Sequence, residues 1–412
     1  MRNLHPVPDP PGPAREAGGG DPAGAGRAAR AARVARAART RRSVQEHPSS
    51  APSPRTQLAL FLNQVDEQLG VVLDDLDRLW SRTLPDPRSL SLLGPVTPPT
   101  AIRALVLGEG KRIRPTAVHL GWVAAGGPVE HEPADDVILL GAALELLHVF
   151  ALVHDDVMDA SATRRGRPTV HEQARLRHQE QTGYGSSVRF GDSVAVLVGD
   201  LAHAEADALV AELPVELRRM WRVLVVELFG GQLLDVVGSA SGRPSARDAR
   251  RVARMKSGAY TVERPLLLGA AAAGATDAVR TALSGYGREV GAAFALRDDL
   301  LGVWGDPVRT GKPAGDDLLE GKPTMIMALG RERLTTPVGR ALLTRAAERG
   351  LREQEVRPLQ DELNGAGVAE EIEDLIAEHI DAAARMLDGE LFPTDCVTEL
   401  MSLAHRVAWR DR

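Results

Sequence analysis

The residues best suited to chemistry are aspartates that follow a long apolar stretch. In LELLHVFALVHDDVMD the apolar run ends in Asp155, Asp156 and Asp159. Asp155 and Asp159 are four residues apart and share one face of a helix, and His148, about two turns earlier, joins that face. Carboxylates this close repel each other unless a cation lies between them, and Mg²⁺ prefers such oxygens together with phosphate oxygens and water. The pattern predicts a divalent metal site, with a solvated acidic helix surface as the alternative.

Basic residues follow this acidic cluster within one loop. RRGRPT supplies Arg164 and Arg165, and guanidinium groups match phosphate oxygens in a bidentate manner. Acids that bind metal beside bases that bind phosphate favour a diphosphate substrate over a metal alone. A further basic cluster, with Lys111 and Arg114, lies upstream in EGKRIRP. Such clusters are common on surfaces, but beside the other motifs this one indicates a second diphosphate pocket.

A second acidic cluster repeats the arrangement later in the chain. ALRDDLLGVWGDP carries Asp298 and Asp299 at the end of another apolar run. Gly302 stands four residues after Asp298, where a third carboxylate could complete the set. TGKPAGDDLLEGKPT follows and offers Lys312 and Lys322. Two acidic helix ends, each followed by bases, form a much more specific signal than either alone.

Shorter motifs lie between the two acidic clusters. GGQLLDV places Gln232 and Asp235 three residues apart, and MKSGAY carries Lys256 and Ser257. Each motif by itself indicates little. Together with the acidic clusters they indicate polar side chains that face a common site.

The elements that must position these residues are expected to be helices. In residues 58–80 Leu and Val recur at helical intervals. Further segments behave likewise, and no strand-like alternation of any length interrupts them: 99–107, 134–153, 192–212, 217–238, 245–272, 277–304, 338–364, 368–388 and 393–407. We therefore predict an all-α fold, a single large helical bundle around a central apolar cavity, over 56–412.

Composition separates this domain from the start of the chain. Residues 1–55 are rich in Ala, Gly, Pro and Arg, and their ten arginines and four acids give a net charge of +6. We expect a disordered tail there, since so little apolar surface cannot offset chain entropy. The whole chain has a net charge of −6, so the domain is near −12, which argues against nucleic acid as a partner.

Cysteine content and hydropathy bear on the compartment. The chain has one cysteine, Cys396, so an intrachain disulfide is excluded and a reducing cytoplasm fits. The first 20 residues lack an apolar core segment, so a secretory signal peptide is not expected. No run of about 18 apolar residues is apparent, so we expect no membrane span.

With these motifs in one order, the chain resembles the trans-isoprenyl diphosphate synthases, the farnesyl and geranylgeranyl diphosphate synthase or polyprenyl synthetase family. The matching motifs are GKRIRP, HDDVMD with RRGRPT, GQLLD, KSG, RDDLLGVWGDP and GKPAGDDLLEGKPT. They span roughly 60–405, and their details are most similar to bacterial geranylgeranyl-type enzymes. The resemblance implies condensation of isopentenyl diphosphate with an allylic diphosphate, with about three Mg²⁺ ions, in a homodimer.

The resemblance also implies a role for each motif residue. Metal would be held by Asp155, Asp159 and Asp298, supported by Asp156 and Asp299. The allylic diphosphate would be held by Arg164, Lys256 and Lys312, with contributions from Gln232, Ser257 and Lys322. The diphosphate of isopentenyl diphosphate would be held by Lys111, Arg114, His148 and Arg165.

Three positions depart from the family pattern. Gly302 replaces a frequent Asp, Ser257 a frequent Thr, and Ala295 a frequent Gln. The resemblance further implies that Phe150 closes a product tunnel and that Ala151 beside it is small, a combination typical of a twenty-carbon product. Core packing is the alternative role for Phe150.

Other functions stay open at this point. A farnesyl or longer-chain synthase would share every motif except the length determinants. The losses at Gly302 and Ala295 fit a non-catalytic subunit of a heteromeric synthase. A terpene cyclase would not need the second diphosphate pocket, and a metal phosphohydrolase would need further histidines at ligand spacing.

Overall fold

The computed structural model describes residues 54–108, 110–127, 134–241, 245–310, 314–387 and 389–410. Within them the fold is all-α, which confirms the predicted fold class. The one pair of strands in this part of the chain is a two-residue hairpin, with β1 (Thr163–Arg164) antiparallel to β2 (Arg167–Pro168). The predicted tail over 1–55 lies outside the described residues, except that Pro54 and Arg55 begin the first helix.

The first half of the domain consists mostly of long helices. In chain order they are α2 (Pro54–Thr83), η1 (Pro87–Leu93), α3 (Pro98–Val106), α4 (Ile113–Ala124), α5 (Asp135–Met158), α6 (Val170–Glu180), α7 (Ser187–Val210) and α8 (Val215–Ser241).

The second half contains one more very long helix and many shorter ones. These are α9 (Ala246–Val252), the π-helix η2 (Ala253–Glu263), α10 (Arg264–Ala272), α11 (Asp277–Trp304), α12 (Pro307–Thr310), α13 (Asp316–Leu319), α14 (Met325–Arg333), α15 (Pro337–Ala347), α16 (Glu353–Gly365), α17 (Val368–Arg385) and α18 (Thr394–Ala408).

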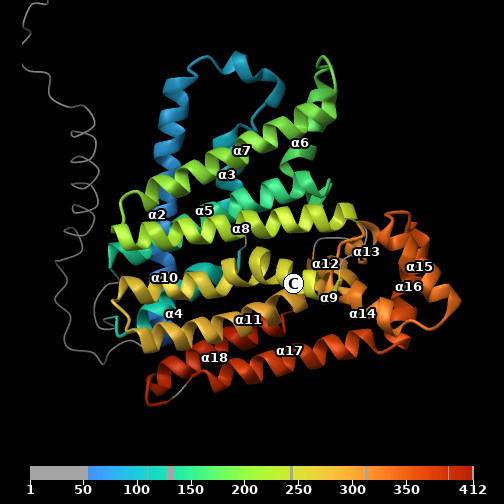
Figure 1. Ribbon diagram of the computed structural model, residues 1–412. Coiled ribbons are helices and arrows are strands. Elements are labelled where there is room, and N and C mark those ends of the chain that lie inside the picture. Colours follow the sequence, from blue (N-terminus) through green and yellow to red (C-terminus); the bar gives the residue numbers. More distant parts are fainter. Residues whose placement is uncertain are drawn as a thin grey trace, which may run out of the picture. The chain divides into compact units, whose positions relative to one another are not determined.

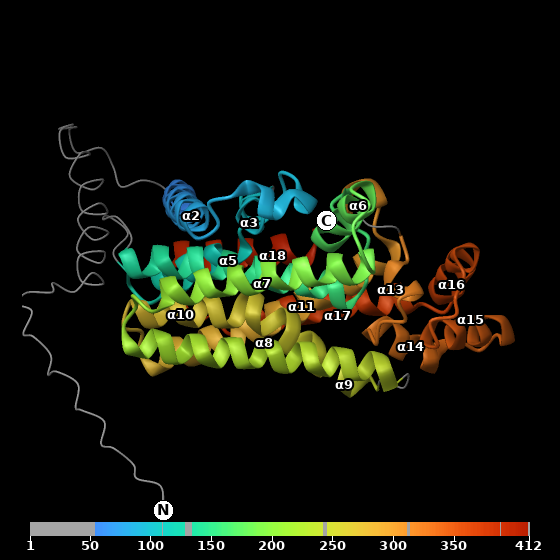
Figure 2. The ribbon, with the colours of Figure 1, turned by 90° about the horizontal axis from the view of Figure 1, so that it is seen from above.

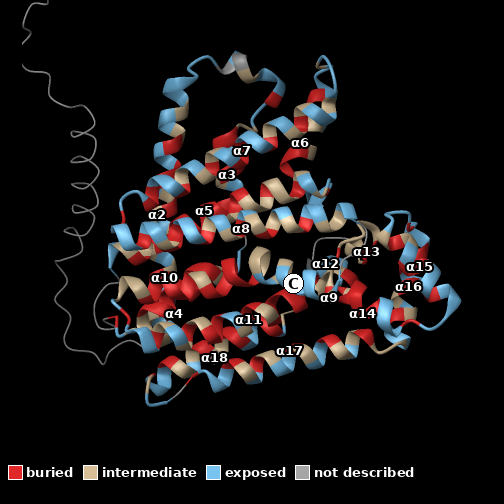
Figure 3. Cartoon of the chain, in the orientation of Figure 1, coloured by how far each residue is buried: buried red, intermediate tan, exposed pale blue. Residues whose placement is uncertain are grey.

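The long helices run side by side along a common direction. Figures 1 and 2 show α5, α7, α8, α10, α11 and α17 in this bundle, with α2 crossing it and α14 to α16 grouped at one end. Burial follows this arrangement, because red segments concentrate on the helices inside the bundle in Figure 3. The acidic ends of α5 and α11 therefore belong to helices whose positions are fixed by packing along most of their length.

Helix α5 is apolar on all sides because it is surrounded by protein. Leu140, Leu144 and Leu147 are completely buried, as expected for a helix in the centre of a large domain. Its one buried carboxylate before the aspartates, Glu145, accepts a 2.6 Å hydrogen bond from Arg112. A buried charge needs such a partner.

The core has two parts that meet at η2. One part gathers side chains mainly from α2 to α8, and the other from α10 to α18. Within η2, Tyr260 belongs to the first part and Val262 to the second. The π-helix that carries Lys256 is thus held from both sides.

Several sequence-based boundaries were wrong. The segment 338–364 is two helices, α15 and α16, separated by a turn around Gly350 and Leu351. The segment 245–272 is helical throughout as predicted, although its middle is the π-helix η2 between α9 and α10, and the helices α4, α6 and α14 were not expected. Helix α4 was missed because its start lies within the basic motif, and α6 because it is largely polar.

Within the described part of the chain, two helices have the length and hydropathy of a membrane span, which was not expected from the sequence. By length and composition alone, α5 and α8 are long and apolar enough to cross a bilayer. The apolar window of α5 is 67% buried inside the domain, as in the core helix of many proteins, whereas that of α8 is only 22% buried. The apolar surface of α8 therefore needs its own explanation.

Candidate active site

The first acidic cluster stands at the carboxyl end of α5. Asp155 and Asp156 lie in the last turn and Asp159 is the C-cap residue. Negative charge is unfavourable at this end of a helix, because the helix dipole points its negative pole there. Stable placement of three carboxylates at this end requires cations from elsewhere in the chain.

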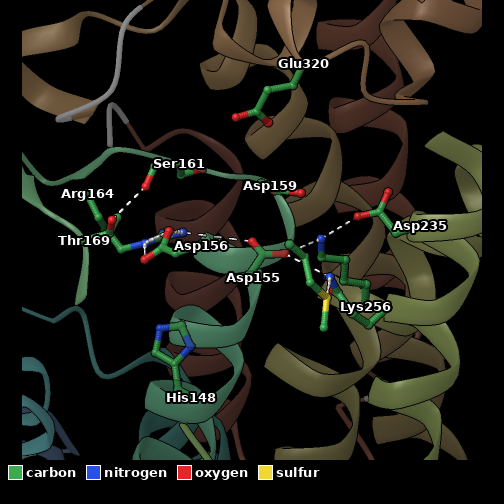
Figure 4. A network of polar contacts seen from close by, with 12 residues as sticks. His148, Asp155, Asp156, Asp159, Ser161, Arg164, Thr169, Asp235, Lys256 and Glu320 are labelled. Atoms are coloured by element: carbon green, nitrogen blue, oxygen red, sulfur yellow. Dashed lines mark hydrogen bonds and ion pairs between the residues drawn. The ribbon is translucent and has the colours of Figure 1, made fainter. Parts of the chain in front are cut away.

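Lys256 supplies one of these cations (Figure 4). Its Nζ lies 2.8 Å from Oδ1 of Asp155 and 2.5 Å from Oδ2 of Asp235, and Gln232 donates a 3.1 Å hydrogen bond to the same oxygen of Asp155. Burial alone would raise the pKa of Asp155, but Lys256, Lys322 and Arg164 hold that pKa well below its usual range. Asp155 is therefore ionised and already surrounded by cations.

Asp156 and Arg164 form a separate pair. Nε of Arg164 donates to both carboxylate oxygens at 2.9 and 3.0 Å, and Nη2 donates to Oδ1 at 2.7 Å. Asp156 is 4% exposed, so its carboxylate is fully committed to this fork. The pair fixes the hairpin β1–β2 to the end of α5, and Arg164 Nη2 also lies 4.0 Å from Asp155.

Lys322 connects the two acidic sides of the site. Its Nζ lies 2.9 Å from Asp159, 2.9 Å from Glu320 and 3.4 Å from Asp317. Burial and the neighbouring charge of Asp155 raise the pKa of Asp159 in spite of this lysine. The neighbouring lysines therefore do not fully offset the cost of a charged Asp159 in this buried place.

Close helix packing brings Lys256 to this position. A Cβ on Gly231 of α8 would lie 2.5 Å from the backbone nitrogen of Lys256, and a Cβ on Gly258 would lie 2.8 Å from the backbone of Gly291 in α11. Only glycine permits backbones to approach this closely. The wider turns of η2 are typical of functional sites, and here they orient Lys256 between α8 and α5.

The second acidic cluster lies at the carboxyl end of α11. Nη2 of Arg410 donates a hydrogen bond to Oδ1 of Asp298, and the guanidinium carbon lies 4.1 Å above the ring of Phe294. Asp299 accepts a 3.1 Å hydrogen bond from the backbone N–H of Met325. Burial, followed by the charges of Asp317 and Asp298, raises the pKa of Asp299 well above its usual value.

The residues assigned to the second diphosphate occupy an adjoining region. His148 Nδ1 lies 2.8 Å from the hydroxyl of Tyr260, and the guanidinium carbon of Arg114 lies 4.1 Å above that tyrosine ring. Burial and the charges of Arg114, Arg164 and Arg165 lower the pKa of His148, so its imidazole is neutral. Arg114 also donates a 3.1 Å hydrogen bond to Thr261.

Lys111 and Arg165 are more exposed than these groups. Lys111 lines a cavity of about 570 Å³ together with three arginines and four less polar residues: Arg309, Arg406, Arg410, Ile113, Thr116, Leu403 and Val407. Arg165 is exposed and adopts a left-handed backbone conformation, with φ of 52°. A cavity lined by four cationic side chains is suited to an anion.

Other predicted positions have plainer surroundings. Ser257 is half-buried beside Lys256 in η2, and Ala295 is buried in the core of α11. Lys312, predicted to hold the allylic diphosphate, lies outside the described residues.

The predicted tunnel floor is an aromatic cluster. Phe150 of α5 is stacked on His203 of α7 at 4.7 Å and on Phe229 of α8 at 5.5 Å between ring centroids, and it contacts His154 at 4.6 Å. Phe150 is 7% exposed, and Ala151 beside it is half-buried. Three helices therefore meet at the position where the growing hydrocarbon was predicted to stop.

The acids are chemically suited to Mg²⁺, although they are not gathered around one point. In the described residues, no group of three His, Cys, Asp or Glu side chains is arranged to hold a metal ion. Instead, Asp155, Asp159 and Asp298 each have a lysine or arginine as partner. Carboxylates are hard oxygen donors that fit Mg²⁺, and burial with neighbouring carboxylates raises the pKa of Asp159 and Asp299, so a bound cation would favour their charged forms. Binding of Mg²⁺ would require the lysine and arginine side chains to leave these carboxylates for other partners.

Some residues of the site were missing from the sequence prediction. Tyr260 contacts His148, and its place in KSGAY could have indicated it, whereas Asp235, which the sequence analysis did point out, contacts Lys256. Glu320 lies in the last predicted motif and contacts Lys322. No sequence motif indicated Arg410, because 112 residues separate it from its partner Asp298.

Comparison with known proteins decides the family. The polyprenyl synthetase family model matches residues 99–362, a span that contains both acidic clusters. The chain belongs to the polyprenyl synthetase family. As a member of this family it is a prenyltransferase, so the predicted enzyme class is confirmed.

Individual members of the family are similar over most of the domain. A crystal structure of geranylgeranyl pyrophosphate synthase from Corynebacterium glutamicum, complexed with isoprenyl diphosphate and magnesium, is 34% identical with a TM-score of 0.77 and covers 85% of this chain and 98% of that one. Octaprenyl diphosphate synthase from Escherichia coli is 30% identical over 75% of this chain and 88% of its own.

A third relative shows higher identity over a shorter stretch. Geranylgeranyl diphosphate synthase from Mycobacterium tuberculosis is 39% identical over 223 residues, which is 53% of this chain and 57% of that protein. The relatives thus include synthases whose products differ in length. Membership in the family therefore does not fix the chain length of the product.

Proposed function

We propose that this prenyltransferase condenses isopentenyl diphosphate with an allylic diphosphate to give geranylgeranyl diphosphate and pyrophosphate in the presence of Mg²⁺. The observation that carries the proposal is that Lys256 and Lys322 already pair with Asp155 and Asp159 of the first acidic cluster, and that Lys322 also reaches Asp317. On binding, a metal–diphosphate complex would replace these lysines as the partner of the carboxylates. The displaced lysines would then bind the diphosphate.

The reaction requires a leaving group whose charge is neutralised. When bound, Mg²⁺ supplies charge neutralisation at the departing diphosphate. Lys256 and Arg164 lie beside Asp155, where they can stabilise the negative charge on the oxygens of the departing diphosphate. Cleavage of the carbon–oxygen bond leaves an allylic cation on the substrate, the double bond of isopentenyl diphosphate attacks it, and the departing pyrophosphate takes the released proton.

The second diphosphate is assigned to the adjoining basic region. Arg114 is held by Tyr260 and Thr261, and neutral His148 is held by Tyr260. Such side chains are preorganised, since their own contacts fix their orientation. Together with Lys111 and Arg165 they would orient isopentenyl diphosphate toward the allylic carbon.

The proposed product length rests on the aromatic cluster around Phe150. Its contacts with His203 and Phe229 close the space between α5, α7 and α8 about one turn before the aspartates. A closed floor at this depth limits the hydrocarbon. The resemblance to geranylgeranyl-type enzymes associates this arrangement with twenty carbons.

Chromatography of dephosphorylated products tests this proposal. The purified chain would be incubated with Mg²⁺, isopentenyl diphosphate and, separately, dimethylallyl, geranyl and farnesyl diphosphate. The expected main product from each starter is the twenty-carbon prenol. A main product of fifteen carbons, or of thirty or more, would contradict the proposed length while leaving the reaction class intact.

We also propose that the enzyme is a homodimer joined through α8. Exposed large apolar side chains recur along this helix every three or four residues: Val223, Val226, Phe229, Leu233 and Val237. An apolar stripe of this extent marks an interaction site. A second copy of the chain provides a matching stripe in an isologous interface, and the family resemblance implies such a dimer.

Sedimentation analysis with one surface variant tests the dimer. We expect wild-type chain to sediment as a dimer and Leu233→Glu as a monomer, because an interfacial carboxylate would be desolvated. Leu79→Glu, on the exposed side of α2, is the control and should leave the dimer intact. A monomeric wild-type chain that instead binds to phosphatidylcholine vesicles would show that lipid covers the stripe.

A further inference from the structure

A carboxylate from a neighbouring segment lies against Gly302 at the end of α11. A Cβ added to Gly302 would lie 1.9 Å from Oδ2 of Asp317 and 2.4 Å from its Cγ. Real Cβ atoms do not approach other atoms this closely. The carboxylate of Asp317 therefore lies directly on the bare α-carbon of residue 302.

This position belongs to the same face of α11 as Asp298. Residues 298 and 302 are four apart in one helix, so their side chains would project in the same direction. A carboxylate that rests on Gly302 consequently stands where a side chain of residue 302 would have placed its own. The difference is only the element that supplies it.

Local structure explains how Asp317 reaches this place. It lies in the short helix α13, which begins after Gly315, a residue with a φ of 82°. Leu318 of the same helix is completely buried in the core and anchors α13 beside α11. With its neighbour anchored inside, Asp317 is directed toward the end of α11.

The charges of these groups act on one another. After burial itself, the negative charge of Asp317 is the largest cause that raises the pKa of Asp299, and it also raises the pKa of Asp298. A like charge has this effect only at short range. In the present state Lys322, 3.4 Å from Asp317, offsets part of the repulsion.

We infer that Asp317 is the third carboxylate of the second acidic cluster and contributes to the binding of Mg²⁺ with diphosphate. Glycine at position 302 is then required for this arrangement, because any side chain there would displace the carboxylate of Asp317. The inference rests on the proposed function. Its simplest rival is that Asp317 serves only as an ion-pair partner of Lys322.

A swap of the two residues separates these alternatives. We would titrate Mn²⁺ into the full-length chain with pyrophosphate present and measure free Mn²⁺ by electron paramagnetic resonance. Asp317→Asn should weaken binding about tenfold or more, as changes around metal sites do. Gly302→Asp should weaken it as well, because two side chains would compete for one space. The double variant Gly302→Asp/Asp317→Gly should recover most of the affinity.

Asp316→Asn is the matched control, since it removes the adjacent carboxylate of the same helix, and its binding should equal that of wild type. Circular dichroism would identify any variant that fails to fold. If the Gly302 variants fail to fold, Asp317→Asn still decides the question, because asparagine has nearly the same shape as aspartate. Wild-type affinity in Asp317→Asn, or no recovery in a folded double variant, would overturn the inference. A wild-type chain that binds no Mn²⁺ with pyrophosphate would overturn the proposed function as well.

Discussion

Nζ of Lys256 lies 2.8 Å from Oδ1 of Asp155, so the first acidic cluster is held by a cation from a π-helix 101 residues later in the chain. The same Nζ lies 2.5 Å from Asp235 of α8. One lysine thus joins α5, α8 and η2 at the point where the diphosphate is proposed to bind.

Lys256→Met should lower kcat/KM about 100-fold, because it removes a preorganised cation from the departing diphosphate. Steady-state kinetics with farnesyl diphosphate would measure it. Arg264→Met is the control, since Arg264 pairs with Glu227 between neighbouring elements at 2.5 Å but has no assigned role. An equal loss in both variants would show that Lys256 acts only through structure.

Asp155→Ala and Asp159→Ala should each reduce turnover roughly 10³-fold, because the loss of a carboxylate removes several kcal/mol of metal-dependent stabilisation. Pyrophosphate release would be the measurement. Asp200→Ala, which removes an exposed carboxylate on α7, should retain wild-type turnover. Substantial activity in either site variant would refute the assignment of the first cluster.

Phe150→Ala should shift the main product to longer chains, because it opens the aromatic floor between α5, α7 and α8. Phe229→Ala should act in the same direction through the stacked partner ring. Chromatography of the prenols gives the answer, and Phe190→Ala, in a different ring contact on α7, should leave the product unchanged. If Phe150→Ala kept the wild-type length, Phe150 would be core packing alone.

Asp299→Asn should raise the Tm of the metal-free protein near neutral pH. Its pKa in the folded state is raised well above the ordinary value of 3.8, so the folded protein holds this proton more tightly than the unfolded chain. The ionised carboxylate therefore destabilises the fold increasingly as pH rises from the unfolded-state pKa to the folded-state pKa, and fully above it. The neutral amide lacks this cost and can still accept from Met325.

The gain in Tm should shrink as pH falls toward the unfolded-state pKa of 3.8, below which the wild-type carboxyl is protonated in both states. Thermal unfolding followed by circular dichroism across this range would show the trend. Asp374→Asn, in an exposed position of α17, should change the Tm little at any pH. A lower Tm for Asp299→Asn at neutral pH would contradict the account.

Sequence motifs predicted most of the site because its chemistry is local. The spacing of Asp155 and Asp159 on an apolar helix requires a cation whatever surrounds it, and the periodicity of long helices such as α11 follows from burial. The sequence did not indicate which cation serves which acid. Lys322 was predicted to bind the diphosphate, and its pairing with Asp159, which depends on tertiary packing, was not predicted.

The misses have the same physical origin. Arg410 reaches Asp298 across 112 residues, and no local pattern records such a contact. The carboxylate of Asp317 that lies against Gly302 was not foreseen, because the space above a glycine is invisible in a sequence. Helix α6 was missed because its polar sequence lacks apolar periodicity, and its packing against α7 comes from the tertiary fold.

The most direct test of the central claim is elongation by the purified chain alone. Labelled isopentenyl diphosphate, farnesyl diphosphate and Mg²⁺ would be incubated with it, and label in extractable prenyl diphosphate would be compared with pyrophosphate released. We predict equimolar formation of both, abolished by EDTA. Absence of labelled product from a folded wild-type chain would contradict the proposal and favour a non-catalytic subunit.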